Sequence, residues 1–107
     1  MSKISCIRIA IQPAGLLSKN QQKFDLGDIG ISELASRHIS DNDAINALRK
    51  HQSGDWLDQH PYTRNANEAA IEGRSNIVSV IRAQGREFWI VTELAWNKTA
   101  IILPREY

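Results

Sequence analysis

The second half of the chain consists of short apolar runs separated by turn-forming residues, a pattern typical of antiparallel strands. The three runs span residues 76–83, 87–94 and 99–103. A tight hairpin is expected at Gln84 and Gly85, between the first two runs, and a second turn is expected before the third. Pro104 ends the third run because proline has no amide hydrogen to donate. The pattern therefore predicts a three-stranded antiparallel meander.

Helical spacing appears in the middle of the chain. Ser40 can accept hydrogen bonds from the first free amides of a helix. Apolar residues then recur at helical spacing, and the basic residues of 49–51 suit the negative end of a helix dipole. Gly54 permits a left-handed stop after the last turn. We therefore predict a helix that begins after Ser40 and ends near His51.

The first forty residues carry weaker signals. Residues 3–11 alternate loosely and are rich in isoleucine, which predicts an N-terminal strand. Within residues 16–31 the stretch 19–23 is polar, and Gly27 and Gly30 bracket Asp28, which predicts a loop. Ser32 is expected to cap a short helix that ends near His38.

A third short helix is expected over residues 66–72. Either Thr63 or Asn65 can cap its first turn, and the preceding residues 58–64 are predicted to form a loop that contains Pro61.

Together these elements predict a single α+β domain over residues 1–107. Two to three short helices, within 32–51 and 66–72, are expected to cover one face of the C-terminal meander, which the N-terminal strand extends. Both alternating sets of side chains in the meander are largely apolar. The sheet therefore needs cover on both faces, or cover on one face and an interface on the other.

Composition and charge narrow the classes of function. The 107 residues include 13 Lys+Arg and 12 Asp+Glu, a formal net charge of +1, and 42% are hydrophobic. The chain is too apolar for a disordered tail, too weakly charged to bind nucleic acid by bulk electrostatics, and too short for a two-domain enzyme. Its single cysteine, Cys6, excludes an intrachain disulfide, and no apolar run approaches the roughly 20 residues that cross a bilayer. We expect a cytoplasmic protein with no cofactor, no bound metal and no membrane contact.

Polar and aromatic side chains from four separate segments form the candidate site. They are His51, Asp55, Trp56, Asn67, Ser79, Arg82, Trp89, Thr92, Glu93 and Thr99. A glutamate within an apolar strand is costly to bury without a partner, so Glu93 is expected at the rim or paired. We expect the turn after the main helix to fold onto the middle C-terminal strand, which would bring His51 and Glu93 into one pocket.

One interpretation of this site is metal-independent RNA cleavage. His51 and Glu93 would then act as the acid/base pair, and an arginine would hold the phosphate group. A tryptophan would stack on a base. The arginine candidates are Arg64, Arg82 and Arg86, and the tryptophan candidates are Trp56 and Trp89. A metal site would instead use His51, Asp55 and Glu93, with His60 as a fourth ligand.

The other interpretation is structural. His51 then only closes the helix end, Asp55 accepts amides of the following turn, and Trp56 fills the core. Glu93 pairs with Lys98 across the hairpin, which contributes roughly 0–1 kcal/mol if the pair is exposed. A solvated face of mixed charge is the corresponding interpretation of the scattered basic residues.

Short segments within residues 44–107 also carry a resemblance. They are His51-Gln52-Ser53-Gly54-Asp55-Trp56, Asn67-Glu68-Ala69, Ser79, Trp89-Ile90-Val91-Thr92-Glu93, Thr99 and Leu103-Pro104-Arg105-Glu106-Tyr107. As a group, in this order, they resemble a family of small proteins of unassigned activity that bacterial plasmids, integrative elements and prophages carry. The chain departs from the family pattern at Leu57, where the family has glycine, at Ile81, where it has tyrosine, and at 94–97. The resemblance implies an accessory role: countering host defence, element maintenance or toxin–antitoxin function.

Two functions follow from these observations. The first is an accessory protein of a mobile genetic element that binds a macromolecular partner, for example a small inhibitor of a host defence system. The near-neutral charge and the aromatic side chains Phe88, Trp89 and Trp96 favour it, because aromatic residues make good interface anchors. A protein partner is expected, with RNA as the alternative, and the apolar sheet can also pair two copies as a homodimer. The second function is the small ribonuclease of the toxin kind, with His51 and Glu93 as acid and base.

Overall fold

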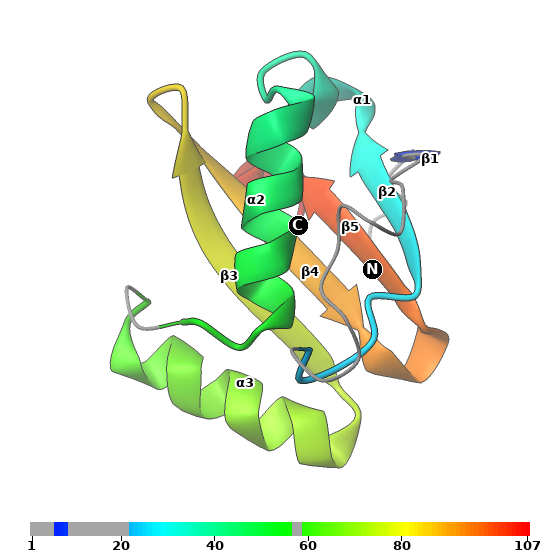
Figure 1. The fold of residues 1–107 in the computed structure, drawn as a ribbon, viewed down its shortest axis with the longest axis vertical. Coiled ribbons are helices and arrows are strands. Elements are labelled where there is room, and N and C mark those ends of the chain that lie inside the picture. Colours follow the sequence, from blue (N-terminus) through cyan, green and yellow to red (C-terminus); the bar gives the residue numbers. More distant parts are fainter. Residues whose placement is uncertain (1–5, 9–21, 57–58) are drawn as a thin grey trace.

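Five strands form one mixed sheet in the computed structural model, which describes residues 6–8, 22–56 and 59–107 (Figure 1). The strands are β1 (Cys6–Arg8), β2 (Asp28–Ser32), β3 (Asn76–Ala83), β4 (Arg86–Glu93) and β5 (Lys98–Ile102). Their order across the sheet is β1-β2-β5-β4-β3. β3, β4 and β5 pair antiparallel in chain order, which confirms the predicted meander. β3 has the predicted bounds, and β4 and β5 each begin one residue earlier than expected.

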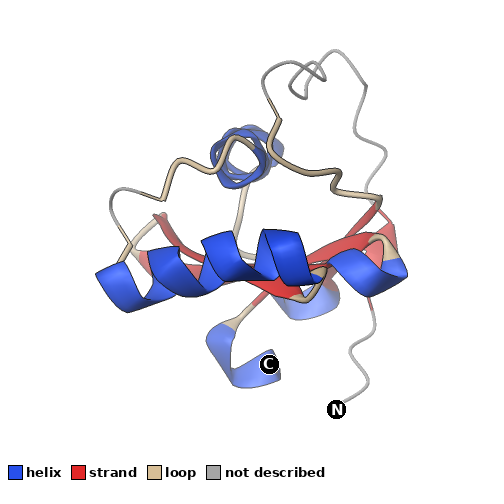
Figure 2. Cartoon of the chain, turned by 90° about the horizontal axis from the view of Figure 1, so that it is seen from below, coloured by secondary structure: helices blue, strands red, loops and turns tan. Residues whose placement is uncertain are grey.

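Three helices and two short 3₁₀ turns complete the described fold. They are α1 (Glu33–Ser36), α2 (Asp41–Gln52), α3 (Pro61–Gly73), η2 (Leu94–Trp96) and η3 (Pro104–Glu106). The predicted α+β architecture is therefore confirmed. α2 lies over one face of the sheet, and η3 lies on the opposite side. α3 runs alongside the sheet, in the same layer as the strands (Figure 2). α3 thus flanks the β3 edge rather than covering the face that α2 covers. Within the described residues, no helix combines the length and the hydropathy that a membrane span needs.

The two predicted serine caps are present. The side chain of Ser40 accepts from the Asp43 amide at 3.1 Å and begins α2, and the side chain of Ser32 accepts from the Ala35 amide at 3.1 Å and begins α1. Each cap satisfies an amide that has no partner within its helix.

β2 corrects the predicted loop over residues 16–31. Asp28–Ser32 is a strand that pairs parallel to β5, with Ile29 opposite Thr99 and Ile31 opposite Ile101. Five residues flanked and interrupted by glycine give little local signal, and the parallel pairing joins segments far apart in the chain. The predicted N-terminal strand is present at Cys6–Arg8, where it pairs with β2, and the rest of 3–11 lies outside the described residues.

α3 begins earlier than expected. It starts at Pro61, within the segment predicted as a loop, and His60 rather than Thr63 or Asn65 is its N-cap. The His60 Nδ1 atom accepts from the Tyr62 amide at 3.1 Å. Proline favours the first helical position because it has no amide to leave unpaired and its φ is already helical. The prediction was wrong because it treated Pro61 as a loop residue.

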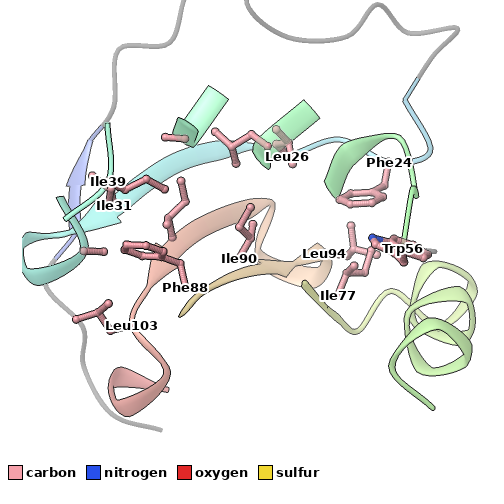
Figure 3. Packing of buried hydrophobic residues seen from close by; sticks show 14 of the residues in the cluster. Phe24, Leu26, Ile31, Ile39, Trp56, Ile77, Phe88, Ile90, Leu94 and Leu103 are labelled. Atoms are coloured by element: carbon pink, nitrogen blue, oxygen red, sulfur yellow. The ribbon is translucent and has the colours of Figure 1, made fainter. Parts of the chain in front are cut away.

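The sheet has two chemically different faces. Side chains alternate along a strand, so Phe88, Ile90 and Thr92 of β4 point toward α2, on what we call the inner face. Ile77 and Ile101 lie on the same face and belong to the apolar core, which Figure 3 shows from close by. We call the opposite side the outer face; it carries Val78, Val80, Trp89, Val91, Ala100 and Ile102.

Candidate functional site

His51 lies at the centre of a buried hydrogen-bond network. It stands in the last turn of α2 and is 1% exposed. Its Nδ1 atom lies 2.5 Å from the Ser79 hydroxyl of β3, and its Nε2 atom lies 2.9 Å from the Thr92 hydroxyl of β4. The Thr92 and Thr99 hydroxyls are 2.8 Å apart, and Thr99 donates to the Leu26 carbonyl at 2.6 Å. We call these five groups the His51 network.

The order of donors in the His51 network fixes the histidine tautomer. A carbonyl only accepts, so the Thr99 proton goes to Leu26, and Thr99 must accept from Thr92. Thr92 has then used its one proton and must accept from Nε2–H of His51. Nδ1 is therefore unprotonated and accepts from Ser79. Each hydroxyl donates once, and the imidazole is neutral in this arrangement.

Burial keeps His51 neutral. Desolvation lowers the pKa of His51 from 6.5 to about 3, because the cation loses its hydration inside the core. The ring of Phe24 packs edge-on against the imidazole, with ring centroids 5.2 Å apart. A histidine in this state holds the helix end to three strands, but it is a poor base at neutral pH and is closed off from a substrate.

The structure does not bring Glu93 to His51. Thr92 faces His51 on the inner face, and Glu93 is the next residue of the same strand. Successive side chains of a strand point to opposite faces, so Glu93 lies on the outer side of the sheet, opposite Lys98 in the register. The single pocket predicted for these two residues is therefore absent from the described part of the chain.

In the turn after α2, the neighbouring side chains of Asp55 and Trp56 have opposite exposures. Asp55 is exposed, whereas Trp56 is buried at 3% exposure and stacks on Phe24 with ring centroids 6.5 Å apart. The Lys23 ammonium lies 5.8 Å from the Trp56 ring centroid. Trp56 thus fills the core as the structural interpretation predicted. With both imidazole nitrogens of His51 occupied by hydroxyls, the donors proposed for a metal are not gathered in one place.

Asn67 closes the free edge of β3 together with Gln59. The Asn67 amide accepts from the Val78 N–H at 2.9 Å and donates to the Val78 carbonyl at 2.7 Å. The Gln59 amide does the same at Val80, at 2.9 and 2.7 Å. Both side chains therefore imitate a neighbouring strand. Asn67 was among the predicted site residues but Gln59 was not, because no local sequence pattern marks a loop amide that reaches an edge strand.

The outer face carries the remaining candidates, Arg82 and Trp89. The Arg82 guanidinium lies 3.7 Å from the Glu87 carboxylate, which also accepts from the Trp89 indole N–H at 3.3 Å. The Trp89 ring packs against Tyr107 with centroids 5.3 Å apart. Tyr107 is 57% exposed and Trp89 is half-buried.

Glu106 fastens the C-terminal turn to this side of the sheet. Its carboxylate accepts from the Ser32 hydroxyl at 2.6 Å and from the Leu103 amide at 2.8 Å. Among the residues that carry the resemblance, His51, Ser79, Thr92 and Thr99 form the His51 network, Asn67 covers the β3 edge, and Glu106 anchors the C-terminal turn.

Comparison of the chain with protein-family models, with curated protein sequences and with solved structures gives no match.

Proposed function

We propose that this chain is a binding protein that holds a protein partner on the outer face of β3, β4 and β5. The observation that carries the proposal is the partly exposed apolar surface there, with Val78, Val80 and Ala100 around Trp89, and Tyr107 at its margin. Tryptophan and tyrosine next to aliphatic side chains are the composition of interface centres.

The charges around this surface favour a protein over a nucleic acid. Arg82 lies 3.7 Å from Glu87 in an ion pair, and Glu93 stands opposite Lys98 in the sheet register. A surface that binds phosphate groups needs an excess of positively charged side chains. A rim with both positive and negative side chains suits a protein partner of complementary charge.

The alternative function, RNA cleavage by His51 and Glu93, has less support. Its two central side chains lie on opposite faces of the sheet, and the imidazole is buried and neutral. The assignment to a mobile genetic element, with countering of a host defence system as its example, rests on the resemblance of residues 44–107.

Binding is tested with an identified partner and matched variants. The tagged chain is used to capture proteins from host lysate, the main captured protein is purified, and its Kd for the chain is measured. Val80→Lys and Tyr107→Ala change the outer face and should raise the Kd by about tenfold or more. Tyr62→Ala removes an aromatic residue that is 78% exposed on α3 and should leave the Kd unchanged.

Three results would contradict the proposal. Equal Kd values for all four chains would place the interface elsewhere. Cleavage of RNA by the purified chain, lost in both His51→Ala and Glu93→Gln, would restore the ribonuclease function. Tight binding of RNA without cleavage, weakened by Arg82→Gln, would replace the protein partner with a nucleic acid.

A further inference from the structure

The β3 edge has the sequence of a strand that pairs readily with other strands. Residues 76–81 are Asn-Ile-Val-Ser-Val-Ile, with no charge, no proline and four β-branched apolar side chains. Such a segment at the free edge of a sheet is a template for another chain unless it is covered. β3 is the last strand in the order, so one of its edges has no strand beside it.

The cover on this edge consists of two side-chain amides. In the antiparallel β3–β4 ladder alternate residues direct their backbone groups to β4, and Val78 and Val80 direct theirs away from it. Those outward groups are the ones that Asn67 and Gln59 occupy, each through one donated and one accepted hydrogen bond. Together the two amides supply the donor and acceptor pattern of a paired strand.

The helix that carries one of these amides is lightly held. Only Asn67 and Ala70 of α3 are buried, and Lys23 meets Glu68 in an ion pair at 2.8 Å whose side chains are both about half exposed. Exposed ion pairs add little to stability. Movement of α3 away from β3 would remove Asn67 and leave the Val78 backbone groups open, while Gln59 lies just before α3 in the chain.

We infer that Gln59 and Asn67 keep β3 from pairing with β3 of a second copy of this chain. The register favours self-pairing: a two-fold axis through Ser79 sets Val78 of each copy opposite Val80 of the other. In that antiparallel arrangement the facing residues exchange both hydrogen bonds. The two amides thus block self-association through the β3 edge, which is a different surface from the outer face.

Removing the amides tests this inference. Gln59→Ala, Asn67→Ala and the double variant are compared with the unchanged chain by sedimentation velocity over a wide concentration range. The double variant should self-associate with a Kd at least about tenfold lower than that of the unchanged chain. Asn65→Ala is the matched control. It removes an exposed amide from α3 and should leave the self-association of the chain unchanged.

Two further measurements locate the contact. Hydrogen exchange should show the Val78 and Val80 amides protected in the associated double variant and exchanging rapidly on dilution. Adding Val78→Pro to the double variant should restore the monomer, because proline removes the outward donor and is tolerated on an edge strand.

Three outcomes would overturn the inference. The first is a double variant that is folded and monomeric at every concentration while its Val78 and Val80 amides exchange rapidly. The second is association that Val78→Pro does not reverse, which would place the contact on another surface. The third is loss of the fold in both single variants, judged by circular dichroism, which would make the amides necessary for folding rather than for keeping the edge closed.

Discussion

At His51 two hydroxyl groups replace the water that an imidazole ordinarily binds. Ser79 and Thr92 satisfy both ring nitrogens, and Thr99 passes the hydrogen-bond chain to the Leu26 carbonyl. Buried polar groups are tolerated when every member has a partner, and such a network then specifies one arrangement of the core. The His51 network therefore fixes how α2 is seated on β3, β4 and β5.

The stability of the fold should depend on the protonation of His51. Its pKa is about 3 in the folded chain and 6.5 without burial, so between these values the unfolded chain binds the extra proton. Stability from this residue is fully present above pH 6.5 and falls as the pH is lowered toward 3, by about 1.4 kcal/mol for each pH unit. Urea unfolding at pH 7 and pH 5 should show a loss of roughly 2 kcal/mol.

A variant isolates this contribution from the other titrating groups. The glutamine of His51→Gln can still form hydrogen bonds but cannot take up a proton. Between pH 7 and pH 5 this variant should therefore lose roughly 2 kcal/mol less unfolding free energy than the unchanged chain. Equal pH dependence in both chains would show that the imidazole is not held neutral in the folded state.

Gly27 occupies a position that other residues cannot. Its φ is +66°, and a methyl group there would overlap the carbonyl oxygen of Asn97. Gly27→Ala should lower the free energy of unfolding by at least about 2 kcal/mol, because backbone strain and a backbone clash add. Gly85→Ala is the control: its φ is +73° but nothing lies within 4 Å, so strain alone should cost about 1 kcal/mol. Chemical denaturation measures both, and equal losses would contradict the clash.

At the scale of elements, α2 depends on its serine cap. Ser40 accepts from the Asp43 amide, whereas Ser36 of α1 donates to the Glu33 carbonyl at an exposed site. Ser40→Ala should lower the free energy of unfolding by about 1 kcal/mol, and Ser36→Ala by less than half of that. Thermal and urea unfolding compare the two, and an equal effect of both changes would contradict the importance of the cap.

Elements with strong local patterns could be predicted from the sequence, and elements made by distant pairing could not. A run of apolar, β-branched residues predicted β3 to the residue, and Ser40 with the apolar spacing predicted α2. β2 was missed because it gains its hydrogen bonds from β5, far along the chain. Local pattern carries no information about that pairing.

The candidate site shows the same division. The sequence picked out His51, Ser79, Thr92 and Thr99, which do meet, because polar side chains within apolar runs need partners. Glu93 was placed with them, although strand alternation already sets it on the opposite face from Thr92. That signal was available in the sequence. The depth at which α2 buries the imidazole was not, since it depends on how Phe24 and the sheet enclose it.

For the whole molecule, stability should be unevenly distributed between the sheet face and the sheet edge. α2 buries Ala44, Leu48, His51 and Gln52 over the inner face, whereas α3 buries only Asn67 and Ala70 beside β3. Local opening is easiest where few apolar contacts must break. We therefore expect α3 to detach from the β3 edge while α2 and the meander stay folded.

Native-state hydrogen exchange at low urea concentrations measures this order. The amides within α3 and the outward amides of Val78 and Val80 should share one opening free energy, at least about 1 kcal/mol below that of the α2 amides. Asn67→Ala should lower the opening free energy of α3 while leaving that of α2 nearly unchanged, because the Asn67 amide joins α3 to Val78. Leu48→Ala is the opposite control, since Leu48 is fully buried in α2 and its loss should weaken both helices together. A single opening free energy for α2, α3 and the β3 edge in the unchanged chain would mean that the edge opens only when the whole molecule unfolds.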